Sequence, residues 1–162
     1  YRSIVKHAFA VVKRGSEEPF AEASVINAVD SINDEPSLAR FDVLQSNSNP
    51  SQFILVQVFK DRSSPYEREE SSEIHARWME KIEDLTVGSI ETLRMTPRFP
   101  LKASNWMYPE DDDDDETELI CRHLSIRVDE NAEKEFLELT ILNARNSIMS
   151  DGVARFDVLQ HD

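Results

Sequence analysis

The heptapeptide ARFDVLQ occurs twice in this chain of 162 residues, at 39–45 and again at 154–160. The similarity extends upstream of both copies, where residues 6–32 align with residues 122–148. The two alignments differ by a shift of one residue just before each heptapeptide. Identities scattered over such a length indicate a duplicated segment. One structural plan must therefore suit both copies, and a fold for the first copy constrains the second.

Alternating apolar residues, capping residues and turns define that plan in the first copy. They predict two helices and four strands: helices at about 17–33 and 65–87, and strands near 4–13, 38–45, 52–60 and 90–98. The order β-α-β-β-α-β is that of the ferredoxin-like fold, an α+β class with an antiparallel sheet.

Helical spacing also predicts which helix residues are buried. The first helix places five apolar residues on one stripe: Ala21, Val25, Ala28, Val29 and Ile32. The second helix does the same with Ile74, Trp78, Ile82 and Leu85, and Gly88 follows as its stop signal.

The second copy repeats only a strand, a helix and the strand ARFDVLQ before His161 and Asp162. We therefore expect a first domain at 1–101, an acidic linker at 102–118 and the N-terminal half of a second domain at 119–162. Half a domain leaves apolar side chains without cover. The segment 121–160 should therefore superpose on 5–45 and lie against the first sheet, related to it by a pseudo-twofold axis. The other half of the second domain would come from a longer chain or from another protein molecule.

The net charge of −14 limits the partners. Eight acidic residues lie in PEDDDDDETE at 109–118, a run that is typical of a solvated, exposed linker. The run lacks the spaced ligands and glycine of a calcium loop. A nucleic-acid partner is not expected from this charge, nor is a membrane partner, because no apolar run approaches the roughly 20 residues of a membrane span. Cys121 stands alone, so a reducing compartment is the simplest interpretation.

The string RFDVLQ, the hairpin into ILVQVF and the helix carrying ARW…EDL together resemble the antibiotic biosynthesis monooxygenase domain. The resemblance covers residues 4–99 and repeats over 121–160. It implies a dimeric α/β barrel, here a tandem member with a partial second repeat, whose cavity lies between the sheet and its helices. Many members carry two histidines on the second helix, and those positions align here with Glu69 and Ile74.

Two histidines are the first candidates for catalysis. His7 and His123 occupy equivalent positions on the first strand of each copy, where each is either a cavity-lining base or a structural histidine bonded to backbone. We expect substrate contacts from Phe9, Phe41, His75 and Trp78. Trp78 is otherwise a core residue.

Other polar positions have simpler interpretations. Glu69 is either a replacement base or a surface glutamate. Arg40 and Asp42 are most simply a structural pair on their strand, as are Arg155 and Asp157.

No phosphate loop, nucleophile elbow or metal-ligand cluster is present in the sequence, so no cofactor or metal is expected. The resemblance then implies a cofactor-independent oxygenase or isomerase that acts on a small hydrophobic or aromatic molecule in the barrel cavity. The alternative is a non-catalytic barrel that binds a ligand or serves as an assembly subunit. The barrel forms either as a pseudo-dimer of the two repeats or as a homodimer.

Overall fold

The computed structural model describes residues 3–106 and 119–161. Residues 4–99 form the predicted β-α-β-β-α-β order, with the second helix divided in two. The elements of this first domain are β1 (Ile4–Val11), α1 (Glu17–Asp34), β2 (Leu38–Gln45), β3 (Gln52–Phe59), α2 (Ser64–Ser71), α3 (Glu73–Ile82) and β4 (Glu91–Phe99). The second copy contributes α4 (Glu133–Ser147) and β5 (Val158–His161), with short 3-10 turns at Ala103–Asn105 and Glu130–Ala132.

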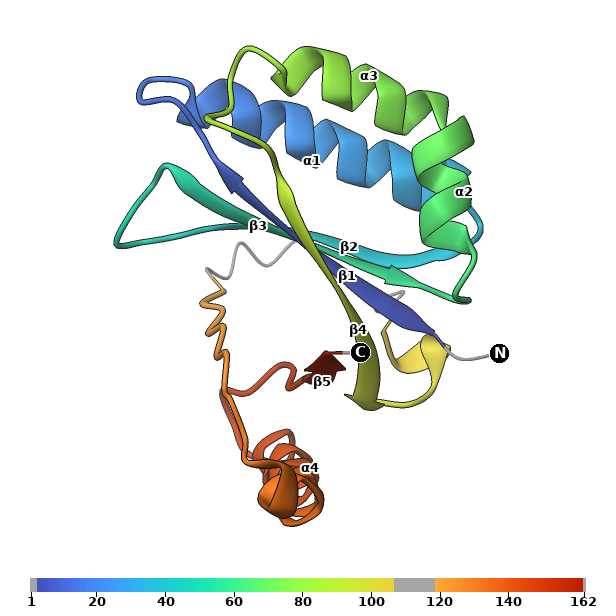
Figure 1. Ribbon diagram of the computed structural model, residues 1–162, viewed down its shortest axis with the longest axis vertical. Coiled ribbons are helices and arrows are strands. Elements are labelled where there is room, and N and C mark those ends of the chain that lie inside the picture. Colours follow the sequence, from blue (N-terminus) through green and yellow to red (C-terminus); the bar gives the residue numbers. More distant parts are fainter. Residues whose placement is uncertain (1–2, 107–118, 162) are drawn as a thin grey trace.

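One antiparallel sheet organises the molecule, with the strand order β2-β3-β1-β4-β5. The predicted ferredoxin-like fold is therefore confirmed. Figure 1 shows α1, α2 and α3 on one side of the sheet and the second copy on the other side. None of the helices among the described residues is both long enough and apolar enough to cross a bilayer.

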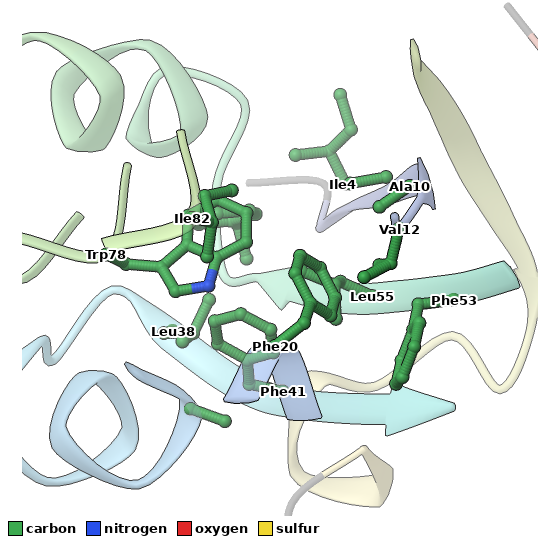
Figure 2. Packing of buried hydrophobic residues seen from close by; sticks show 13 residues of the cluster. Ile4, Ala10, Val12, Phe20, Leu38, Phe41, Phe53, Leu55, Trp78 and Ile82 are labelled. Atoms are coloured by element: carbon green, nitrogen blue, oxygen red, sulfur yellow. The ribbon is translucent and has the colours of Figure 1, made fainter. Parts of the chain in front are cut away.

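The main core fills the space between the sheet and the helices. Phe20 of α1 stacks near Phe53 of β3, with ring centroids 4.8 Å apart, and Trp78 of α3 closes the cluster (Figure 2). Each is at most 4% exposed. Strand alternation explains the arrangement, because every second residue of β1 and β3 faces the helices.

The buried stripe of α1 agrees with the predicted one at Ala21, Ala28 and Ile32, which lie in or against the core, but not at two other positions. Val25 and Val29 were expected in the core, yet they are 49% and 53% exposed. The buried side chains are Phe20, Ser24, Asn27, Ala28 and Ser31. The prediction failed because three of these are polar, and an apolar pattern cannot anticipate burial that depends on hydrogen-bond partners from another helix.

The predicted helix 65–87 is interrupted at Ser72. This residue has an extended backbone (φ −76°, ψ 118°), and its hydroxyl accepts a hydrogen bond from the backbone N–H of His75 at 3.1 Å. Ser72 is thus the N-cap of α3. The chain changes direction there, and α2 crosses the end of the sheet while α3 runs along α1 (Figure 1).

The acidic linker was expected to be exposed from residue 102 onward, and this is wrong at its start. Trp106 is fully buried against Val5 and Val58 on the face of the sheet opposite the helices, and its indole N–H donates to the carbonyl of Pro100 at 3.0 Å. A large aromatic side chain gains more from burial than a polar linker residue does. Residues 107–118, which hold the acidic run, lie outside the described residues.

The second copy adds only one strand to the sheet. β5 pairs with β4, while residues 121–128, expected as a strand, are extended without strand pairing. The copies touch through the β5–β4 pair and the Arg155–Asp42 ion pair. The predicted cover of the second copy's apolar side chains is wrong for Leu124, Ile126 and Ile148, which are 75%, 59% and 41% exposed. Superposition of 121–160 on 5–45 remains a prediction.

Candidate functional site

A row of polar side chains crosses the apolar layer between the sheet and the helices. Lys6 of β1 lies directly opposite Gln57 of β3 on one side and Arg94 of β4 on the other. Directly opposed residues in antiparallel strands have Cβ atoms about 5 Å apart. Lys6 and Gln57 are 6% and 2% exposed. Burial of charged and polar groups is costly, so this row requires specific partners.

Glu69 of α2 is the partner of the charged members of the row. Its carboxylate forms an ion pair with Lys6 and lies 3.6 Å from Arg94. Burial alone would raise the pKa of Glu69. The hydrogen bond and charge of Lys6, with the charge of Arg94, outweigh that effect and hold the pKa below its usual value. Glu69 is therefore ionised at neutral pH.

Arg68, the residue before Glu69, joins α1, α2 and α3 from the inside. It is 5% exposed, and its Nε donates to Glu35 at 2.7 Å. Its Nη2 donates to Asn27 at 3.1 Å and to Ser31 at 2.8 Å, and its Nη1 lies 2.9 Å from Nδ1 of His75. Arg68 thus supplies hydrogen bonds to Asn27 and Ser31, two of the three buried polar residues of α1.

His75 at the start of α3 stands between this arginine and the Lys6–Glu69 pair. Burial, followed by the positive charges of Arg68 and Lys6, lowers the pKa of His75 to about 4. The imidazole is therefore neutral at pH 7. Its ring lies 5.9 Å from that of Trp78, whose indole N–H donates to Ser24 at 3.1 Å.

A groove opens beside this network, where the end of α1 meets α2 and α3. Its volume is about 480 Å³, and both Glu35 and Arg68 reach it. Hydroxyl groups of Ser64, Ser71 and Ser72 also line it. Lys6, Glu69 and His75 do not line this groove, and Arg68 with Glu35 connects it to His75.

His7 and Phe9 face away from the helices, toward the second copy. The ring of His7 lies 5.3 Å from that of His123 and 6.2 Å from that of Phe9. Burial, together with the neighbouring His123, lowers the pKa of His7 to about 4. His7 is 4% exposed, and its Nδ1 is buried without a partner among the described residues.

A charged cluster on the same face joins the two copies of ARFDVLQ. Arg40 donates to Asp42 at 2.8 Å, and Arg155 donates to Asp157 at the same distance, which agrees with the predicted pairs. Arg155 also lies 3.8 Å from Asp42 and stacks on the ring of Trp106 at 4.5 Å. Burial raises the pKa of Asp157.

The structure divides the candidates drawn from the sequence between the two faces of the sheet. Phe41, His75 and Trp78 lie on the helix side. His7, Phe9 and His123 meet one another on the opposite side. The two groups cannot act on the same atom of one substrate, because the sheet separates them.

Sequence reasoning missed Lys6, Gln57, Arg68 and Glu35. Two signals were available for the strand residues. Lys6 and Gln57 interrupt the helix-facing apolar alternation of β1 and β3, which is an unusual position for a charged or amide group. No local pattern predicts that Arg68 and Glu35 are functional, because both lie in charged stretches of the sequence that are typical of exposed surface.

The described residues hold no group of three or more His, Cys, Asp or Glu side chains placed to bind a metal ion.

A sequence model of one protein family matches the chain. It is described as antibiotic biosynthesis monooxygenase and matches residues 3–81. A search of curated proteins gives no match.

Solved structures from several bacteria share the fold. A protein of Nitrosomonas europaea named for the same family is 28% identical, with a TM-score of 0.58, and the match covers 62% of this chain and 95% of that one. A protein of Bacteroides thetaiotaomicron, also named for the family, is 14% identical with a TM-score of 0.55, covering 61% of this chain and 92% of the other. Another protein of that organism, of unknown function and described as a possible oxidoreductase, is 17% identical with a TM-score of 0.50, covering 57% and 97%.

Proposed function

We propose that the chain is a cofactor-independent oxygenase or isomerase of a small molecule, because residues 3–81 match the sequence model of the antibiotic biosynthesis monooxygenase family. The observation that carries the proposal is the polar cluster between β1, α2 and α3, where an ionised Glu69, a neutral His75 and the ammonium group of Lys6 lie together, with the Glu69 side chain 36% exposed to solvent. Ionisable groups with perturbed pKa values are typical of functional sites.

Glu69 is the proposed base. It is ionised at neutral pH and can accept a proton from a carbon atom next to a carbonyl group. Negative charge then develops on the carbonyl oxygen, and Lys6 and the His75 ring are the groups that can stabilise it. An isomerase returns the proton to a neighbouring carbon atom. An oxygenase instead lets the carbanion reduce O₂.

His7 is a second proposed base, on the other face of the sheet. Two observations favour it: the imidazole is neutral at pH 7, and its Nδ1 is buried without a partner in the described part of the chain. A substrate would then lie between the two copies, near Phe9 and His123.

A non-catalytic assembly role is the alternative function. The pairing of β5 with β4 and the contact of Arg155 with Asp42 support it, because both join one repeat to the other. Polar residues of the buried layer would then serve stability alone.

Oxygen uptake and isomerisation assays on a panel of anthrone- and quinol-type compounds test the proposal, with Glu69→Gln as the main variant. Glutamine keeps the size and an acceptor for Lys6 but cannot take the proton. Glu70→Gln is the matched control, because Glu70 is the exposed neighbour on the same helix. Loss of about a hundredfold in turnover in the first variant alone supports Glu69 as the base. Absence of any turnover by the unmodified chain favours the assembly role.

A further inference from the structure

Arg68 contacts four side chains that come from different parts of the fold, and His75 is one of them. We propose that Arg68 is a positioning residue that fixes His75 as a neutral ring with its proton on Nε2, so that the ring can only donate a hydrogen bond to a bound molecule. The assigned role in catalysis rests on the proposed function, whereas the state of the ring does not.

The tautomer follows from the chemistry of the contact. A guanidinium group has five N–H donors and no acceptor. Its Nη1 lies 2.9 Å from Nδ1 of His75, so Nδ1 must present a lone pair. In a neutral imidazole the proton then belongs on Nε2. Nε2 has no hydrogen-bond partner within residues 3–106 and 119–161, and it is the nitrogen that remains for a ligand.

Other hydrogen bonds hold Arg68 in this contact. Glu35, Asn27 and Ser31 accept from Nε and Nη2, and the guanidinium lies over the ring of Phe41 at 5.7 Å. With the contact to His75, four of its five N–H donors are engaged, and a planar group held in this way is preorganised.

The same network also holds the backbone of His75. The hydroxyl of Ser72 donates to Glu35, the carboxylate that binds Arg68. The oxygen of that hydroxyl accepts the N–H of His75 at 3.1 Å. Ring and backbone are therefore fixed by one connected set of hydrogen bonds, and the ring position depends on Arg68 directly and through Glu35.

Charges of both signs face the ring from the elements packed around it, and their balance with burial decides whether it takes a second proton. Arg68 and Glu69 face it from α2, Lys6 from β1 and Glu35 from the end of α1. Burial and the two cations outweigh the two carboxylates, and the pKa falls to about 4. The ring therefore does not change charge at neutral pH.

A neutral hydrogen-bond donor in this position suits the step in which a carbon next to a carbonyl group loses its proton. It can bind a carbonyl oxygen and the oxyanion formed when a neighbouring carbon loses its proton, without giving up its own proton. His75 is then a hydrogen-bond donor and not the base, and the base must be another group, which agrees with Glu69.

Nitrogen NMR of the histidine rings tests the inference on the full chain without any substrate. In the unmodified protein we expect Nδ1 of His75 to be unprotonated and Nε2 to be protonated, with no change in ring charge from pH 8 to pH 5. A proton on Nδ1, or a titration near pH 6.5, would overturn the inference.

The variant Arg68→Met/Glu35→Gln removes the guanidinium without leaving a buried carboxylate unpaired. We expect the His75 ring to populate both tautomers and its titration to move upward by at least one pH unit. Arg77→Met is the matched control, because Arg77 is an exposed arginine on α3 and should leave the ring unchanged. Identical ring spectra in the double variant and the control contradict the proposal. If no compound is turned over while the predicted tautomer is found, the proposed function fails and this inference stands.

Discussion

The ring of His123 lies against the ring of His7, with centroids 5.3 Å apart and planes inclined by 60°. The two residues occupy equivalent positions in the two copies of the repeat. The contact therefore joins corresponding positions of the two copies on the face of the sheet that the helices leave uncovered, although residues 121–128 form no strand. The duplicated ARFDVLQ adds a second contact between the copies on this face, where Arg155 approaches Asp42.

Acidification should destabilise the protein before its carboxylates titrate. His7 and His75 have pKa values of about 4 in the folded state and about 6.5 when unfolded. Between these values the unfolded chain binds more protons, so the free energy of unfolding falls as the pH falls. Each histidine should contribute a loss of up to about 2 kcal/mol between pH 7 and pH 5.

Urea denaturation at the two pH values measures this effect. His7→Gln should lose less stability on acidification than the unmodified chain. Equal losses in the two proteins would show that His7 titrates normally.

Replacing His7 by Gln also distinguishes the two proposed bases. If Glu69 is the base, turnover of His7→Gln should stay within about twofold of the unmodified chain, because His7 lies on the other face of the sheet. Loss of a hundredfold or more would place the base at His7. The sequence-based hypothesis for His7 stays a prediction until this is measured.

Trp78→Phe should cost stability through one hydrogen bond. The ring contact with Phe20, whose centroid is 6.4 Å away, can persist, but Ser24, which is fully buried, loses the donor at 3.1 Å. An unsatisfied buried hydroxyl costs about 1–3 kcal/mol. In a double-mutant cycle, adding Ser24→Ala should recover part of that cost. Strict additivity of the two changes would contradict the assigned contact.

Trp106→Ala should weaken both the first domain and its contact with the second copy. The indole is fully buried against Val5 and Val58 and carries the stacked guanidinium of Arg155. Loss of a buried tryptophan costs about 3–5 kcal/mol. The thermal unfolding midpoints of this variant and of Trp78→Phe compare how much packing on each face of the sheet contributes to stability. An unchanged midpoint for Trp106→Ala would show that the linker residue does not belong to the fold.

The sequence predicted the strands well because their signal is local. Alternation in IVKHAFAVV and QFILVQVFK gave β1 and β3 to within two residues of their observed ends. It did not predict the stripe of α1, because Asn27 and Ser31 are buried only by virtue of Arg68, which is 37 residues or more away in the chain. The break at Ser72 was missed for a similar reason, since its hydroxyl is tied to Glu35.

The candidate site shows the same limit. Trp78 is buried as its apolar stripe predicts, and Phe41 lies on the same side of the sheet in the structure. The side of the sheet that His7 faces follows from the same alternation. What the sequence could not show is which face carries the buried ionisable network, because Lys6, Glu69 and His75 meet only in the folded chain.

We propose that the protein binds its small-molecule substrate on the helix side of the sheet. Ligand mapping by NMR tests this most directly. An anthrone-type compound is titrated into the full chain while backbone and side-chain signals are followed. We predict saturable shifts at Lys6, Gln57 and His75, with the signals of His7, Phe9 and His123 unchanged. Shifts confined to His7, Phe9 and His123 would contradict the claim and move the site to the face between the two copies.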